Sequence, residues 1–155
     1  MYKKILLTSD GSKNSDYAIK HALQIASDES AEIIVLHVVD SKHLSSLPDE
    51  ALDKDDVDFN THSNTVLKHV IEVIDKIKSK YNIGDQVNVR TLIVEGNPAD
   101  QIINVCKKEG IDMIIMANSG KHKLDRFLLG SVTEKTIREA PVPVLVIPAN
   151  YSPKN

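Results

Sequence analysis

Short apolar runs and longer amphipathic stretches alternate along this chain. Five runs rich in β-branched and other apolar residues predict β-strands, and they cover residues 4–8, 33–39, 87–94, 112–116 and 144–147. Between these runs, apolar residues recur at the spacing of one helix face, which predicts four amphipathic helices. Strand and helix therefore alternate from one end of the sequence to the other.

Local signals place the ends of two of these helices. Asn97 and Pro98 are typical of a helix start, because asparagine caps free amides and proline suits the first turn, and Gly110 is typical of a helix end. The four residues 131–134 (SVTE) match a capping box with Ser131 as the N-cap, and Pro141 closes that last helix. The polar, acidic segment 41–60 is expected to be a loop that orders over a ligand or a partner.

Strict alternation predicts right-handed crossovers and a mostly parallel five-stranded sheet with helices on both faces. We therefore expect a single doubly wound α/β domain over residues 1–155, with strand order 3-2-1-4-5. Ligands of such sheets bind beyond the carboxyl ends of the strands, where the strand order reverses. That rule brings the loop after the first strand and the loop after the fourth strand to opposite sides of one crevice.

Composition limits the range of functions. The chain has 155 residues, is 41% hydrophobic and carries a formal net charge of -3. It offers no broad basic surface for nucleic acid or an anionic membrane. The first apolar run is too short for a signal sequence or a membrane span, so a cytoplasmic protein is expected. Cys106 is the single cysteine and is expected to be a buried thiol, while His62 and His69 are expected at the surface.

The segment that follows the fourth strand carries the main chemical signal. Gly120 is followed by nine residues and then by Gly130 and Ser131, which together suggest a strand end, a glycine-bearing loop and a helix start. Amide groups displayed in this way suit phosphate. The four residues Lys121, His122, Lys123 and Arg126 add positive charge to this loop. An anionic ligand, and specifically a nucleotide, is therefore predicted.

Four segments resemble the universal stress protein family of the UspA type over almost the whole chain: KILLTSDGS at 4–12, LHVVD at 36–40, EGNPA at 95–99 and APVPVLVI at 140–147. The ATP-binding branch of that family carries the motif G-x2-G-x9-G-[S/T]. Gly120, Gly130 and Ser131 match it, whereas Ala117 replaces the first glycine. The resemblance implies that ATP, accompanied by Mg²⁺ or Mn²⁺, is the ligand.

The resemblance also implies which residues form the site. The adenine and ribose side would involve Asp10, Val38, Met116 and Ala117. The phosphates would meet Ser119, Gly120, Gly130, Ser131, Val132 and Thr133. Family homodimers pair through the final strand, which begins at Val142 and ends at Ile147 in this chain, so a homodimer is expected as well.

Ala117 raises a physical question. If the family glycine has a positive φ, alanine costs about 1 kcal/mol in that conformation; if φ is negative, only crowding by the methyl group matters. Weakened rather than abolished binding is expected. Simpler roles also exist for Ser131 as a helix cap, for Gly120 and Gly130 as turn residues, and for Asp10 as a cap of the turn that follows it.

Three functions stay open at this point. The leading one is an ATP-binding regulatory module in a stress response, whose nucleotide state alters loop conformation and partner choice. The others are a nucleotide-independent dimeric interaction protein and a weak ATPase. No base and nucleophile pair stands out, so slow hydrolysis at most is expected. The sequence also lacks a P-loop, a G-x-G-x-x-G fingerprint and a complete EF-hand loop.

Overall fold

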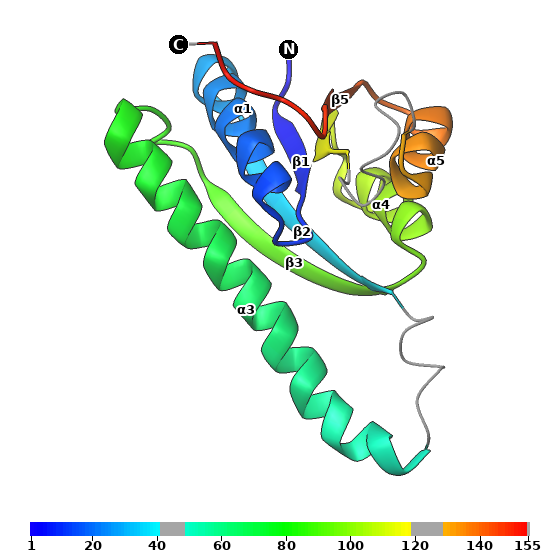
Figure 1. The fold of residues 1–155 in the computed structure, drawn as a ribbon. Helices are drawn as coiled ribbons and strands as arrows, with labels where there is room; N and C mark the ends of the chain where they lie inside the picture. Colours follow the sequence, from blue (N-terminus) through cyan, green and yellow to red (C-terminus); the bar gives the residue numbers. More distant parts are fainter. Residues whose placement is uncertain (41–48, 119–128, 155) are drawn as a thin grey trace.

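The five predicted strands form one parallel sheet (Figure 1). The computed structural model of the protein describes residues 1–40, 49–118 and 129–154. The strand order is β3-β2-β1-β4-β5 and all four neighbouring pairs are parallel, which confirms the predicted doubly wound α/β fold. The strands are β1 (Lys4–Thr8), β2 (Glu32–Asp40), β3 (Val89–Gly96), β4 (Met113–Ala117) and β5 (Val144–Ile147).

Helices cover both faces of this sheet. The described part of the chain holds α1 (Lys13–Glu29), α3 (Asp49–Tyr81), α4 (Pro98–Glu109) and α5 (Ser131–Glu139). The pair α1 and α3 packs on one face, and the pair α4 and α5 on the other (Figure 1). The α4 signals are confirmed, because the Asn97 side chain accepts a hydrogen bond from the Asp100 amide and Gly110 ends the helix with φ 64°.

Each face of the sheet has its own apolar core. In the central strand β1, Ile5 and Leu7 pack toward α1 and α3, whereas Leu6 packs toward α4, and all three are fully buried. This arrangement explains why the strands appear as continuous apolar runs in the sequence. Cys106 is buried in the second core, as predicted, and its burial raises the pKa of the thiol.

The prediction of a loop over residues 41–60 is wrong from Asp49 onward, where α3 begins. The sequence has neither glycine nor proline between Asp49 and Gly84, and a helix of 33 residues can therefore run without interruption. Residues 41–48 lie outside the described residues. None of the described helices is both long enough and apolar enough to cross a membrane.

The predicted capping box at the start of α5 is also wrong. Gly130, not Ser131, is the N-cap residue, and no side chain caps the helix. The carbonyl of Gly130 accepts the first helical hydrogen bond, from the Glu134 amide at 2.9 Å. The buried residues of this helix are Thr133 and Thr136, and Val132 packs against the second core as a partly buried side chain.

Candidate functional site

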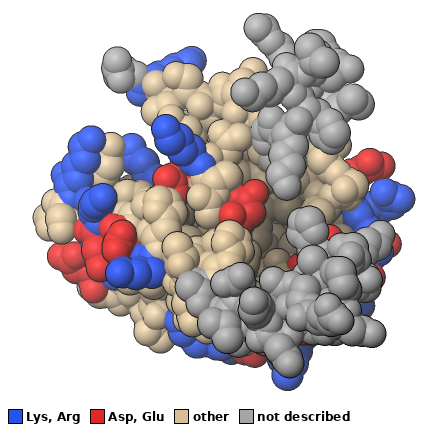
Figure 2. All heavy atoms as spheres, turned by 60° about the horizontal axis from the view of Figure 1, so that its bottom comes forward, with Lys and Arg blue, Asp and Glu red and all other residues tan. Residues whose placement is uncertain are grey.

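A cavity of about 420 Å³ lies at the carboxyl ends of β1, β2 and β4. Figure 2 turns this edge of the sheet toward the reader and shows uncharged residues over most of its centre, with acidic side chains beside them. Eight of the ten residues predicted for the site line the cavity. They are Asp10, Val38, Met116, Ala117, Gly130, Ser131, Val132 and Thr133.

The other two predicted residues, Ser119 and Gly120, lie outside the described residues. The same holds for the four basic side chains that the sequence analysis placed in this loop, which are Lys121, His122, Lys123 and Arg126. The described part of the site therefore comprises the ends of the strands, the starts of α1 and α5, and the first turns of α4.

The start of α5 forms one wall of the cavity and presents backbone amides. The first amides of a helix have no acceptor within the helix. Among the residues that the structure describes, none accepts a hydrogen bond from the amides of Ser131, Val132 or Thr133. The Gly130 amide, in contrast, donates to Oδ1 of Asn118 at 2.9 Å. Three helical amides thus remain as donors beside the cavity, together with the positive end of the helix dipole.

Ala117 has an ordinary strand conformation. Among the described non-glycine residues, those with positive φ are Ser30 and Asn82, so φ of Ala117 is negative. Ala117 is the last residue of β4 and pairs with Ile147 of β5. The strain considered for alanine at this position therefore does not arise, and crowding of a ligand by the methyl group is the remaining effect.

Hydrogen bonds around Ser9 shape the opposite wall. The Ser9 hydroxyl donates to the Ser15 hydroxyl at 3.1 Å and accepts from the Gly11 amide at 3.2 Å. Asp10 follows and is exposed, with its Oδ1 accepting from the Ser12 amide at 2.9 Å. Asp10 therefore does cap the turn that follows it, which is the simpler role considered above. This hydrogen bond uses the Oδ1 atom of the carboxylate and not Oδ2.

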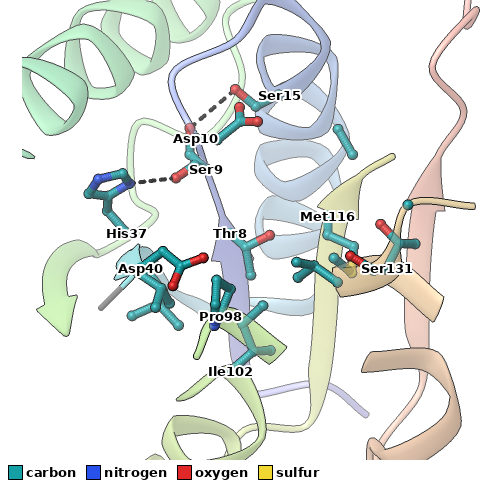
Figure 3. A pocket seen from close by; sticks show the side chains of 16 residues that line it. Thr8, Ser9, Asp10, Ser15, His37, Asp40, Pro98, Ile102, Met116 and Ser131 are labelled. Carbon is teal, nitrogen blue, oxygen red and sulfur yellow. Dashed lines mark hydrogen bonds between the residues drawn. The ribbon is translucent and has the colours of Figure 1, made fainter. Parts of the chain in front are cut away.

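His37 is buried in β2 and also lines the cavity. Its Nδ1 lies 3.0 Å from the carbonyl oxygen of Ser9, and the ring points toward Ser9 in Figure 3. The ring centroid of His62 in α3 lies 6.3 Å from the centroid of the His37 ring. His62 is exposed, as predicted, and Nε2 of His69 lies 3.2 Å from Oδ1 of Asp16.

Sequence reasoning did not assign eight further lining residues to the site. They are Thr8, Ser9, Ser15, Leu36, His37, Asp40, Pro98 and Ile102. Six of them stand at or near the end of a predicted strand or at the start of a predicted helix. The rule that ligands bind at the carboxyl edge of a parallel sheet already brought the loop that contains Thr8 and Ser9 to this crevice, and the same rule applies to the other four. Leu36 and Ile102 lie deeper in their elements and gave no such signal.

The cavity is chemically different at its two ends. Asp10 and Asp40 lie on the side of β1 and β2, whereas Ser131 lies across the cavity beside β4 (Figure 3). Between them the wall is apolar, through Pro98, Ile102 and other side chains. This arrangement fits a small ligand with an anionic group at α5 and a flat, weakly polar body. No three His, Cys, Asp or Glu side chains of the described ranges converge as a metal site would require.

Comparison with known proteins agrees with this architecture. The model of a family described as the universal stress protein family matches residues 1–148. Universal stress protein MJ0531 of Methanocaldococcus jannaschii is 36% identical over 95% of this chain and 82% of its own length. Universal stress protein MJ0577 of the same organism is 34% identical, and 95% of each chain is covered.

Solved structures give the same picture. A structure of MJ0577 has a TM-score of 0.70 at 33% identity, covering 98% of this chain and 99% of the other. A universal stress protein in complex with cAMP has a TM-score of 0.69 at 20% identity, covering 94% and 96%. A universal stress protein of Archaeoglobus fulgidus in complex with dAMP has a TM-score of 0.65 at 17% identity, covering 94% and 98%. The complexes with cAMP and dAMP are 20% and 17% identical to this chain, so these two comparisons show a shared fold and nothing more.

Proposed function

The chain belongs to the universal stress protein family, and on that premise we propose that it binds an adenine nucleotide, ATP, in the cavity at the carboxyl ends of β1, β2 and β4. The observation that carries the proposal is the start of α5. It offers the amides of Ser131, Val132 and Thr133 beside a cavity of mononucleotide size.

The phosphate groups would bind at α5. Amides at a helix N-terminus and the hydroxyl groups of Ser131 and Thr133 are donors that match phosphate oxygens, and the helix dipole favours negative charge there. Because Ser131 does not cap the helix, its hydroxyl group has no competing task in the described structure. Mg²⁺ or Mn²⁺ would be held mainly by the phosphates.

The base and sugar would bind on the side of β1 and β2. Val38, Ile102 and Met116 supply apolar surface for a planar base. Asp10 and Asp40 supply carboxylates that can accept hydrogen bonds from an exocyclic amine or from ribose hydroxyl groups. Other proteins of this fold hold cAMP or dAMP, which makes an adenine nucleotide the natural candidate.

A binding module, rather than an efficient enzyme, is the function proposed here. Nucleotide binding would order the segments around the cavity and so alter the surface offered to a partner in a stress response. We propose that the protein also forms a homodimer through β5, because β5 is an edge strand with half-buried apolar side chains.

Calorimetric titration of ATP and Mg²⁺ into nucleotide-free protein tests the proposal. Micromolar binding is expected for the wild type, and strong weakening for Gly130→Asp, because its carboxylate would stand against the phosphates. Gly130→Asn is the matched control: both residues are good N-caps, and the backbone at φ -60° accepts either, so a larger loss for Asp reports on charge. Absence of heat and of any thermal shift in the wild type would favour the nucleotide-independent dimer.

The third function needs a separate assay. Metal-dependent release of ADP that disappears in Gly130→Asp would show a weak ATPase. Stoichiometric binding without such release would favour the regulatory module.

A further inference from the structure

A hydrogen bond joins the buried imidazole of His37 to Ser9, the residue before Asp10. A carbonyl oxygen can only accept a hydrogen bond, so the 3.0 Å contact between Nδ1 and the Ser9 carbonyl requires a proton on Nδ1. The imidazole is 7% exposed. Without this bond, both buried groups would lose the partner that the structure gives them.

The bond acts where the sheet ends. β1 pairs with β2 up to Thr8 and Leu36, and the Ser9 amide still donates to the Leu36 carbonyl at 3.1 Å. At the Ser9 carbonyl the donor is a side chain, His37 Nδ1. The imidazole therefore holds the chain at the residue from which it leaves the sheet toward α1.

Fixing the Ser9 carbonyl also fixes the peptide unit that begins Asp10. In a trans peptide the carbonyl and the following amide point in opposite directions. No described residue accepts a hydrogen bond from the Asp10 amide. His37 thus sets the direction of the Asp10 amide and the position from which the Asp10 side chain extends at the cavity.

We propose that His37 is a positioning residue for the ligand: by donating from Nδ1 to the Ser9 carbonyl, it holds Asp10 in the orientation that binds the sugar or base of the nucleotide. This inference rests on the proposed function. It assigns to His37 a task in ligand affinity, in addition to its packing in the sheet. The neutral Nδ1–H tautomer and the imidazolium can both donate this hydrogen bond. The neutral Nε2–H tautomer cannot donate it, because its Nδ1 carries no proton.

The experiment combines nitrogen NMR of the wild type with ATP titrations of four proteins: the wild type, His37→Leu, His37→Asn and His62→Leu. The NMR spectrum is expected to show a protonated Nδ1. Leucine removes the donor, and affinity is expected to fall about 5- to 10-fold. Asparagine places an amide donor near the position of Nδ1, and affinity should return to within about twofold of the wild type. His62→Leu removes the neighbouring ring alone and is expected to bind as the wild type does.

The outcomes separate this inference from the proposed function. A wild type that does not bind ATP overturns both. A wild type that binds, with His37→Leu equally tight or with His37→Asn as weak as His37→Leu, overturns the inference alone. Equal losses in His37→Leu and His62→Leu also overturn it, because they would indicate ring packing.

If His37→Leu does not fold, His37→Gln replaces it, since glutamine keeps polarity and moves the donor toward the position of Nε2. A proton found on Nε2 instead of Nδ1 is decisive against the inference.

Discussion

Oδ1 of Asn118 accepts a hydrogen bond from the amide of Gly130, at 2.9 Å and across twelve positions of the sequence. The backbone amide of Asn118 in turn donates to the Ile147 carbonyl at 2.8 Å. One buried residue therefore joins the end of β4 to the start of α5 and to the end of β5. The placement of the α5 amides beside the cavity depends on this side chain.

Asn118→Ala is expected to lower the free energy of unfolding by about 1–3 kcal/mol, because a buried amide loses its acceptor. ATP affinity should fall with it. Asn118→Asp keeps an acceptor oxygen but adds negative charge at the phosphate side, so its stability should lie closer to the wild type while its ATP affinity falls further. Urea unfolding and calorimetry measure the two quantities. An alanine variant as stable as the wild type would contradict the role given to Asn118.

Ala117→Gly restores the glycine of the family motif. Because φ of Ala117 is negative, no strain is relieved, and glycine in a strand is expected to cost about 0.5–1 kcal/mol of stability. ATP affinity should rise at most slightly, through removal of the methyl group. A gain in thermal stability would show that alanine is strained here, contrary to the structure.

Two helix starts should respond differently to alanine. Asn97 caps α4 with its side chain, so Asn97→Ala is expected to cost about 1 kcal/mol. The Ser131 side chain does not cap α5, so Ser131→Ala should change stability by less than about 0.5 kcal/mol while it weakens ATP binding. Denaturant unfolding of both variants checks the contrast. Equal costs at the two positions would restore the capping box that the sequence suggested.

Stability should decrease in acid partly through Asp112. Hydrogen bonds from the backbone amides of Lys3 and Lys4 favour its carboxylate and lower its pKa. The folded protein therefore binds fewer protons than the unfolded chain. This contribution is complete above the ordinary pKa of aspartate, about 3.9, and is lost as pH falls through the lowered value. Asp112→Asn should be less stable than the wild type at neutral pH, and the difference should shrink in acid. A difference that stays constant from neutral pH into acid would refute this origin.

Dimerisation should depend on the outer edge of β5. The carbonyls of Pro143 and Ile147 accept hydrogen bonds from β4, so by strand alternation the backbone groups of Val144 and Val146 point to the outer edge. Val146→Pro removes one outward donor and should shift sedimentation at micromolar concentration toward a monomer. Val146→Thr keeps the shape and the donor and should stay dimeric. A wild-type monomer would end the proposal.

The parts of the structure that could be predicted from the sequence are those that local chemistry determines. The parallel sheet with helices on both faces followed from alternation and crossover handedness, and the ends of α4 followed from Asn97 and Gly110. The local sequence favours Ser131 as the N-cap of α5, one residue later than the structure has it, and it gives no sign of the hydrogen bond from the Gly130 amide to the distant Asn118 side chain. The polar, acidic composition at the start of α3 favours a loop, whereas the absence of glycine and proline there allows the helix that forms.

The site shows the same division. Residues that belong to a motif, such as Gly130 and Ser131, could be found by spacing, and the structure brings them to the cavity. Asp40 and His37 line the same cavity from the end of β2, but no motif spacing singles them out. The role inferred for His37 depends on a carbonyl 28 positions earlier, which no spacing rule connects to it.

The way in which α5 is anchored has a consequence for motion. The buried residues of α5 are two threonines, one of which has a hydroxyl without a partner in the described structure, and Val132 is only partly buried against the second core. Detachment of this helix therefore exposes less apolar surface than opening of the sheet would. The amides of α5 should therefore exchange with solvent hydrogen through local opening, well before the amides of β1. A ligand that bridges the start of α5 to the sheet would slow that exchange. The protein would then report an occupied cavity as a change in the order of one surface helix, while the sheet beneath it stays the same.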